Sequence, residues 1–288
     1  MRQTRSLAAG LVLAVAAAGC GGTDPATVEP GTSAVTTTTT VTTTAPITTP
    51  VTAERLRLNV VATHPHDTAA FTEGLLFDDH GALYESTGQY GESSIRRVEP
   101  DTGAVLETVA LDPTLFGEGL AMSADGTLVQ LTWKEHRALR WTADGLTPGG
   151  TQTYDGEGWG LTDDAAGSRL VMSNGSSTLT FRDPTTFAVT GTVEVTLDAA
   201  PVTQLNELEA VDGVIWANVW QTDQIMRIDP TTGRVTGVVD ASGLLSATQL
   251  AEADVLNGIA HRPGDPADRL WVTGKYWPTM FEVDVVPA

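Results

Sequence analysis

The 288-residue chain has only one cysteine, Cys20, so it cannot form an intramolecular disulfide. Basic residues are also scarce: 16 lysines and arginines stand against 36 aspartates and glutamates, and the formal net charge is -20. This balance argues against nucleic acid as a partner, because phosphates favour a basic surface. The chain has no G-x-S-x-G motif, so nothing in it suggests a serine nucleophile of the hydrolase type. A soluble, acidic domain is expected.

Histidines are few and scattered. His64 and His66 form an H-P-H spacing, while His80, His136 and His261 are isolated, and no cysteine is available to join them. This pattern does not assemble a convincing zinc site. We therefore expect these histidines in loops or in the core, and no metal site.

The N-terminus resembles an export signal. Arg2 and Arg5 precede the apolar run from Leu7 to Ala18, which is too short to span a membrane, and the small residues before Cys20 form a lipobox arrangement. Residues 1–20 are therefore predicted to be a lipoprotein signal peptide with Cys20 as the lipidated residue. The predicted location is the outer face of the cytoplasmic membrane, in the cell envelope. The alternative is an ordinary signal peptide with a free cysteine.

Residues 21–53 are rich in threonine, proline, valine and alanine and include the unbroken run from Thr36 to Thr40. Such a segment cannot bury a core, so it is predicted to be a disordered tether. The remainder, residues 54–288, is long enough for one domain of ordinary size.

Within residues 54–288 a carboxylate or an amide recurs near a Gly-Leu step or a similar apolar step. The near-repeats are FTEGLLF around Glu73, FGEGLAM around Glu118, GEGWGLT around Glu157, LNELEAV around Asn206 and LNGIAHR around Asn257. A period of about 40–50 residues is typical of radial repeats, most plausibly a β-propeller. A propeller brings equivalent positions of its blades to one central mouth, so these polar residues are expected to converge.

Each repeat continues with alternating strands, such as those from Leu83, Leu128, Leu170, Ile215 and Leu270. Acidic-Pro-x-x-Gly turns, such as Glu99 to Gly103, reverse the chain into the next strand. The last repeat lacks an outer strand, whereas Leu56 to Thr63 alternates and has no partner of its own. The prediction is an all-β, five-bladed β-propeller whose ring is closed by the N-terminal strand completing the last blade.

The segments HPHDTAAFTEGL, LYESTGQYGESSIR, FGEGLA, QLTW, EGWGLT, LNELE, IWANVWQTDQI, DVLNGIA and VTGKYWP follow one another between His64 and Phe281. In this order they resemble the plant-type glutaminyl-peptide cyclotransferases, which also occur in bacteria. The resemblance implies a five-bladed propeller that converts the N-terminal glutamine of peptides or proteins to pyroglutamate and releases ammonia. It implies neither a catalytic metal nor another cofactor, and we expect a monomer.

Matching the motifs residue by residue, the resemblance implies that Glu118 is the catalytic acid and base. The substrate-binding residues it implies are Phe71, Glu73, Trp133, Trp159, Asn206, Trp220 and Lys275. At position 73 this chain departs from the plant pattern, which has glutamine, although glutamate is familiar there among bacterial relatives; the departure leaves the role of Glu73 open and not the family. Trp141, Trp216 and Trp271 are expected in the core, which is also the alternative place for Trp133, Trp159 and Trp220.

The chemistry is compatible with these residue types. The α-amine of the substrate attacks its own γ-carbonyl, so no enzyme nucleophile is needed. One carboxylic acid with a raised pKa can move both protons, and Asn206 or an indole N–H can stabilise the oxyanion. A second carboxylate at Glu73 would raise the pKa of one of the pair and would suit the incoming α-ammonium.

Two other functions remain open at this level. One is a lipid-anchored propeller that binds peptides or small ligands without chemistry. The other is a calcium-dependent lactonase or other hydrolase of propeller type, which would need several acidic and amide ligands at the channel. Ammonia release that a chelator abolishes would favour the hydrolase, and no release at all would favour the binding protein.

Overall fold

The computed structural model describes residues 52–164 and 168–288. The predicted signal peptide, Cys20 and nearly all of the predicted tether lie outside these residues. The described part is built from strands, with one four-residue helix, α1 (Ala247–Leu250), which confirms the all-β class. Within this part, no helix has the length and apolar character needed to cross a membrane.

Three antiparallel sheets have four strands each, taken in sequence order. The first contains β2 (Thr72–Phe77), β3 (Leu83–Thr87), β4 (Ser94–Val98) and β5 (Val105–Ala110). The second contains β6 (Gly117–Met122), β7 (Thr127–Thr132), β8 (Arg137–Thr142) and β9 (Pro148–Thr153). The third contains β10 (Leu161–Asp163), β11 (Leu170–Met172), β12 (Thr178–Arg182) and β13 (Val189–Glu194). A short hairpin of β14 (Thr196–Leu197) and β15 (Ala200–Pro201) follows.

The remaining strands form one eight-stranded sheet with the order β16-β17-β18-β19-β1-β22-β21-β20. Its C-terminal strands are β16 (Leu205–Val211), β17 (Val214–Val219), β18 (Gln224–Ile228), β19 (Val235–Asp240), β20 (Leu256–Ala260), β21 (Arg269–Gly274) and β22 (Thr279–Pro287). The N-terminal strand β1 (Glu54–Pro65) pairs antiparallel with β22 and, over its first residues, parallel with β19. The first and last strands of the described chain are therefore hydrogen-bonded neighbours, as the sequence predicted.

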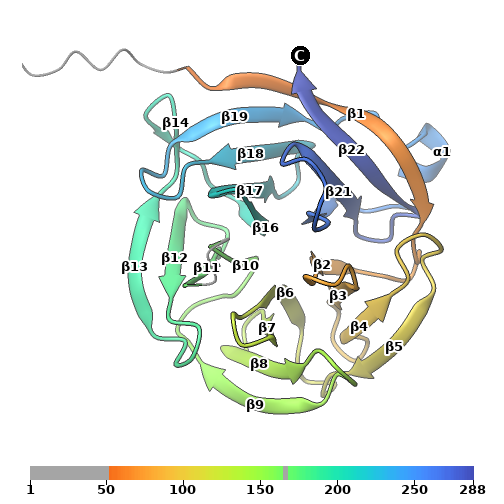
Figure 1. Ribbon diagram of the computed structural model, residues 1–288, viewed down its shortest axis with the longest axis vertical. Coiled ribbons are helices and arrows are strands. Elements are labelled where there is room, and N and C mark those ends of the chain that lie inside the picture. Colours follow the sequence, from red (N-terminus) through yellow and green to blue (C-terminus); the bar gives the residue numbers. More distant parts are fainter. Residues whose placement is uncertain (1–51, 165–167) are drawn as a thin grey trace, which may run out of the picture. The chain divides into compact units, whose positions relative to one another are not determined.

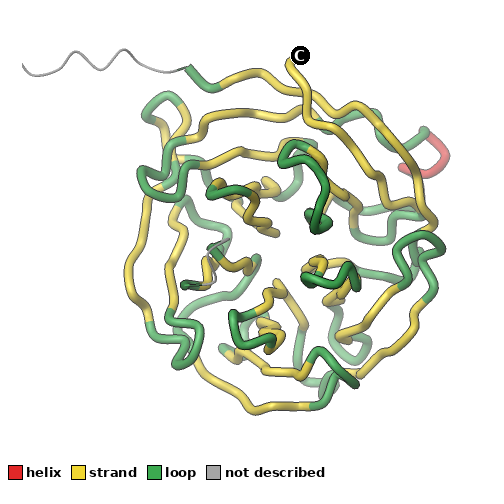
Figure 2. The backbone as a smooth tube through the Cα atoms, in the orientation of Figure 1, coloured by secondary structure: helices red, strands yellow, loops and turns green. Residues whose placement is uncertain are grey.

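The sheets are arranged around a common centre, with β2, β6, β10 and β16 nearest to it (Figure 1). Figure 2 shows the same arrangement, with loops connecting the strands on the inner and outer sides. Burial follows this order: every residue of β2 is buried, whereas the outer strand β5 alternates between exposed and half-buried residues. The arrangement is consistent with a β-propeller.

The glycines of the Gly-Leu steps allow neighbouring inner strands to approach closely. A Cβ atom built on Gly74 would overlap the backbone nitrogen of Leu120 in the next sheet. The same holds for Gly119 against the backbone of Leu161, one sheet further. Only glycine fits where two backbones come this near, which explains why the step recurs in the sequence.

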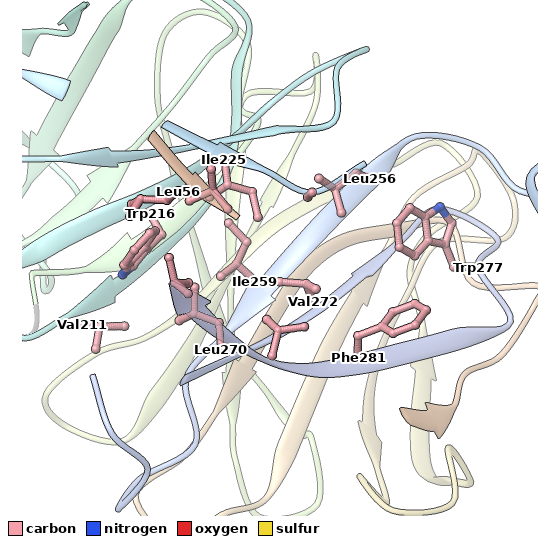
Figure 3. Close-up of a cluster of buried hydrophobic side chains, with 14 of the residues drawn as sticks. Leu56, Val211, Trp216, Ile225, Leu256, Ile259, Leu270, Val272, Trp277 and Phe281 are labelled. Atoms are coloured by element: carbon pink, nitrogen blue, oxygen red, sulfur yellow. The ribbon is translucent and has the colours of Figure 1, made fainter. Parts of the chain in front are cut away.

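The apolar core lies between successive sheets. One cluster of buried side chains joins β1 to β16–β22 and includes Leu56, Trp216, Ile225, Leu256, Ile259, Leu270, Val272, Trp277 and Phe281 (Figure 3). Trp216 and Trp271 are only 3% and 1% exposed, and Trp141 is 6% exposed, so the three tryptophans predicted for the core are there.

A buried polar network connects the end of β1 to β3 and β4. His66 Nε2 lies 3.0 Å from Glu85 Oε1, while His66 Nδ1 lies 2.7 Å from the Trp277 carbonyl oxygen. Arg96 Nε donates to Glu85 Oε2 at 2.9 Å. Burial acts to raise the pKa of Glu85, but the charges of Arg96 and His66 outweigh it and lower the pKa to about 2. His66 therefore has a structural role in the core, as expected.

Candidate active site

A pocket of about 300 Å³ opens at the centre of the ring of sheets. All eight residues predicted for the site line it: Phe71, Glu73, Glu118, Trp133, Trp159, Asn206, Trp220 and Lys275. Four further lining residues were not singled out from the sequence as site residues, namely Phe116, Gln221, Asp254 and Val255. Three of the five near-repeat positions, Glu73, Glu118 and Asn206, converge on the pocket as the pattern predicted, whereas Glu157 and Asn257 do not line it.

Irregularities in the innermost strands direct these side chains. The pairing of β2 with β3 shifts register between Thr72 and Gly74, at Glu73. The pairing of β6 with β7 shifts between Gly117 and Leu120, at Glu118. The inner strands β16 and β20 show the same shifts, at Asn206 and Asn257 respectively. Because a β-bulge re-aims a side chain out of the regular alternation, these four repeats direct their polar residues alike, whereas the third inner strand, β10, pairs with β11 without a shift.

Glu73 and Lys275 form a buried ion pair. Lys275 Nζ lies 2.7 Å from Glu73 Oε1, and the two side chains are 7% and 2% exposed. Asn257 Nδ2 lies 3.3 Å from the other oxygen, Glu73 Oε2. Burial raises the pKa of Glu73, whereas the charge and the hydrogen bond of Lys275 act in the opposite direction. Glu73 therefore already has a cation beside it, the Lys275 ammonium group. From the sequence, the expected cation at Glu73 was the α-ammonium group of the substrate.

Glu118 is the second carboxyl group of the pocket and is hydrogen-bonded to Glu73. Burial, followed by the negative charge of Glu73, raises the pKa of Glu118 well above its ordinary value. When two carboxyl groups share a site, one of them holds the proton. The positive charge of Lys275 next to Glu73 makes Glu73 the ionised member and Glu118 the protonated one.

Two amides flank this pair. Asn206 is only 3% exposed, and its buried Oδ1 has no hydrogen-bond partner within residues 52–164 and 168–288. Its amide is therefore available to a ligand in the pocket. Asn257, by contrast, donates to the Thr72 carbonyl oxygen at 2.8 Å and to Glu73, so it holds the carboxylate in place.

Aromatic rings form the walls of the pocket. Phe116 contacts both Phe71 and Trp133, with ring centroids 6.0 Å and 5.6 Å away. On the other side Trp159 meets Trp220 edge-on at 5.5 Å. The indole N–H groups of Trp133 and Trp159 both donate to Glu157 Oε2, at 2.9 Å and 3.1 Å. These rings exclude water from one side of the carboxyl pair and strengthen the electrostatic effects there.

Glu207 and Glu209, which flank Asn206 in sequence, accept hydrogen bonds from the backbone. Glu207 Oε2 accepts from Ile259 N at 2.8 Å, and Glu209 Oε1 accepts from His261 N at 2.7 Å. Both residues connect β16 to the segment around β20, which gives them a structural role. In the described part of the chain, no three or more histidine, cysteine, aspartate or glutamate side chains are grouped so as to hold a metal ion.

The arrangement has the parts needed for proton transfer in a confined site. It offers one protonated carboxyl group, a fixed ion pair that keeps the proton there, an unpaired amide and apolar walls. A carboxyl group with a raised pKa can give and take a proton near neutral pH. The amide N–H group can stabilise an oxygen that gains negative charge.

Comparison with known proteins agrees with this geometry. The sequence profile described as Glutamine cyclotransferase matches residues 32–285. A glutaminyl-peptide cyclotransferase of Arabidopsis thaliana is 40% identical over 236 residues, which cover 80% of this chain and 72% of the plant protein. The crystal structure of Myxococcus xanthus glutaminyl cyclase superposes with a TM-score of 0.72 at 40% identity and covers 81% of this chain and 99% of the bacterial one. The predicted enzyme class is thereby confirmed, and the chain belongs to the glutamine cyclotransferase family.

Proposed function

We propose that this protein converts the N-terminal glutamine of peptides or proteins to pyroglutamate and releases ammonia, with Glu118 as the acid and base. The observation that supports this most directly is the buried unit of Lys275, Glu73 and Glu118 in an aromatic pocket. It is an acid of raised pKa in a pocket whose walls are mostly aromatic and whose size admits one side chain. No cofactor or metal takes part in the proposed reaction.

In the proposed complex the glutamine side chain lies between the aromatic walls, and its α-amine lies near Glu118. A pocket of about 300 Å³ is at the small end of the range for ligand sites and suits one residue at a chain terminus. Holding the amine near the γ-carbonyl of the same residue replaces an entropically costly search by one fixed orientation. The rest of the peptide extends from the mouth.

In the proposed reaction Glu118 carries out both proton transfers: it gives one proton to the leaving nitrogen and takes one from the ring nitrogen. The neutral α-amine attacks the γ-carbonyl carbon, and a C–N bond forms while the carbonyl oxygen takes up negative charge. Glu118 gives its proton to the departing amide nitrogen, and the C–N bond to that nitrogen breaks with release of ammonia. The Glu118 carboxylate then takes the surplus proton from the new ring nitrogen, which restores the acid. General acid–base catalysis of this kind contributes roughly 10²–10⁴-fold.

The oxyanion is stabilised by Asn206 in this proposal. Its side chain lines the same pocket as Glu118, and its buried Oδ1 has no partner in the described part of the protein, so the amide is free to turn its Nδ2–H group toward the substrate oxygen. The indole N–H groups of Trp133 and Trp159 are already bonded to Glu157, so they are not the donors. Removing one oxyanion donor typically costs about 10²–10³ in kcat.

For the fold we propose five blades. The three four-stranded sheets count as three, and the eight-stranded sheet divides between β19 and β1 into β16–β19 and β20–β22 with β1. The parallel pairing of β1 with β19 covers only residues 54–57 and supports treating these as two blades.

We also propose that Cys20 carries a lipid and that the protein lies on the outer face of the cytoplasmic membrane. The basis for this proposal is the lipobox arrangement before Cys20.

Mass spectrometry of a glutamine-initiated peptide tests the activity. The expected product is lighter by about 17 Da, the mass of ammonia, at a rate above uncatalysed ring closure. The same peptide with an acetylated α-amine is the control and must stay unchanged, because its nucleophile is blocked. Absence of any mass change with the free peptide would support the binding protein instead. Loss of activity on adding a chelator would support a calcium-dependent hydrolase.

A further inference from the structure

Glu157 occupies the third near-repeat position, yet it does not line the pocket. It lies in the connection between β9 and β10, two residues before Trp159. Its side chain is about 40% exposed. The proton-transfer steps do not need it. Its contacts, however, all lead to pocket tryptophans or to a residue beside one.

The Glu157 carboxylate holds two indoles with a single oxygen. Oε2 accepts from Trp133 Nε1 at 2.9 Å and from Trp159 Nε1 at 3.1 Å. The other oxygen, Oε1, lies 3.7 Å from Lys134 Nζ. That ammonium group in turn lies 3.5 Å from the centroid of the Trp133 ring. One carboxylate and one ammonium thus fix the orientation of the Trp133 ring from its edge and from its face.

Glu157 also bridges a gap in the aromatic wall. Ring contacts run from Tyr276 through Phe71 and Phe116 to Trp133, and separately from Trp159 to Trp220. No ring contact joins Trp133 to Trp159 within residues 52–164 and 168–288. Trp133 follows β7 and Trp159 precedes β10, in successive sheets, and Glu157 is the described side chain that hydrogen-bonds to both.

The backbone makes this bridge possible. Gly158 N donates to the Trp133 carbonyl oxygen at 3.0 Å, which sets the Glu157 segment beside β7. Trp133 N donates to the Phe116 carbonyl oxygen at 3.0 Å, and Trp159 N donates to the Ser173 carbonyl oxygen at 3.2 Å. The main chain of each tryptophan is therefore held by its own sheet, and the hydrogen bonds to Glu157 add the constraint on ring rotation.

The carboxylate remains ionised over the working range of pH. Burial acts to raise the pKa of Glu157, but the hydrogen bonds from Trp159 and Trp133 and the charge of Lys134 outweigh it and lower the pKa below its ordinary value. An ionised acceptor makes stronger hydrogen bonds to N–H donors than a neutral one does.

We propose that Glu157 is a positioning residue, which locks the indoles of Trp133 and Trp159 and so sets the width of the slot for the substrate glutamine side chain. This inference rests on the proposed function of the pocket. Because the walls contact the substrate both before and during the reaction, loosening them should weaken binding more than it slows chemistry.

The test compares Glu157→Ala, Glu157→Gln and the control Asp155→Asn in the full-length protein. Asp155 is exposed, lies two residues earlier in the same loop, and makes no hydrogen bond or ion pair within the described residues. The control therefore removes one negative charge from the loop without touching an indole. We expect Glu157→Ala to lower kcat/KM about tenfold, mostly through KM, because both indoles lose their charge-assisted hydrogen bond to Glu157. Glu157→Gln keeps an acceptor oxygen and should recover part of this loss, whereas Asp155→Asn should stay within about twofold of the wild type.

A second readout does not depend on turnover. The indole N–H resonances, assigned by Trp→Phe substitution, should move for Trp133 and Trp159 in both Glu157 variants and stay in place for the core residues Trp141, Trp216 and Trp271. Unchanged resonances of Trp133 and Trp159, or a kcat/KM of Glu157→Ala equal to that of Asp155→Asn, would overturn the proposal. If Glu157→Ala does not fold, Glu157→Gln decides by the same two readouts. A wild-type protein that releases no ammonia refutes the proposed function, and the resonances then still test the role of Glu157.

Discussion

Lys275 Nζ lies 2.7 Å from Glu73 Oε1 at the bottom of the pocket, although 202 positions separate the two residues in the chain. The pair comes from β2 and from the residue after β21, which belong to different parts of the ring of sheets. Its position next to Glu118 means that the charge on Glu73 and the charge on Lys275 act on the same proton with opposite signs. Substituting each partner in turn therefore separates the two effects.

Glu73→Gln should move the alkaline limb of the pH–rate profile to lower pH. Burial and the charge of Glu73 are the two largest causes that raise the pKa of Glu118, and the substitution removes the second while leaving Lys275 in place. The acid form of Glu118 is then lost at lower pH. Most of the turnover at the new optimum should remain, because Glu118 still carries the proton in the proposed reaction. An unmoved limb, or a loss of turnover as deep as that caused by removing the Glu118 acid, would contradict the assignment.

Lys275→Met should move the same limb in the opposite direction. The positive charge of Lys275 acts to lower the pKa of Glu118, so its removal raises that pKa further. The substitution leaves Glu73 as a buried carboxylate without its cation. Such a group typically destabilises a fold by about 3–5 kcal/mol unless it takes up a proton. The pH–rate series is therefore run together with thermal unfolding. A shift to lower pH in a folded protein would show that the pair does not control the proton as described.

Glu85→Gln should destabilise the protein in a pH-dependent manner. The substitution leaves His66 without its carboxylate and Arg96 with Asp67 as its remaining partner, and breaking a buried pair in this way costs about 3–5 kcal/mol. Glu85 has a folded-state pKa of about 2 against an ordinary value of 4.5, so its contribution is complete above pH 4.5 and is lost as the pH falls through 2.

His66 adds the opposite dependence, because burial acts to lower its pKa but the charge of Glu85 outweighs burial and raises the pKa above 6.5. Its contribution is complete below pH 6.5 and is lost as the pH rises through the raised value. Denaturant unfolding should therefore show the largest difference between wild type and Glu85→Gln between pH 4.5 and 6.5. A difference that is constant from acidic to alkaline pH would disprove the role of the ion pair.

Cys20→Ser should release the protein from the membrane fraction without changing its activity. The hydroxyl group of serine cannot carry the thioether that a lipobox cysteine acquires, so the lipid anchor is lost. Fractionation followed by a salt wash measures this, and cyclase activity in the soluble fraction is the control. Persistent membrane association of the serine variant would refute lipidation at Cys20.

Much of this site could be predicted from the sequence because the repeats mark it. The Gly-Leu steps identify the inner strands, and Gly74 shows why, since its missing Cβ leaves room for the neighbouring strand. The polar residues next to these steps, Glu73, Glu118 and Asn206, all line the pocket. The strand order also followed from the pattern, because an N-terminal alternating segment without a partner complements a last repeat without an outer strand.

The remaining features depend on contacts that no linear pattern encodes. The bulges that direct Glu118 and Asn206 into the pocket are differences in pairing register between two strands, which the alternation of side chains does not show. Asn257 matches the repeat, but its contact with Glu73 cannot be read from the sequence, because 184 positions separate the two residues. Asp254 precedes the last near-repeat, and nothing in its surroundings indicated that it borders the pocket.

The turnover of Glu118→Gln tests the central claim most directly. Glutamine keeps the size and hydrogen-bonding capacity of the side chain but cannot move a proton, so kcat for a glutamine-initiated peptide should fall by about 10²–10⁴. Folding and peptide binding should persist, as measured by thermal unfolding and by the affinity for the same peptide. A folded Glu118→Gln protein that cyclises the peptide at the wild-type rate would contradict the account.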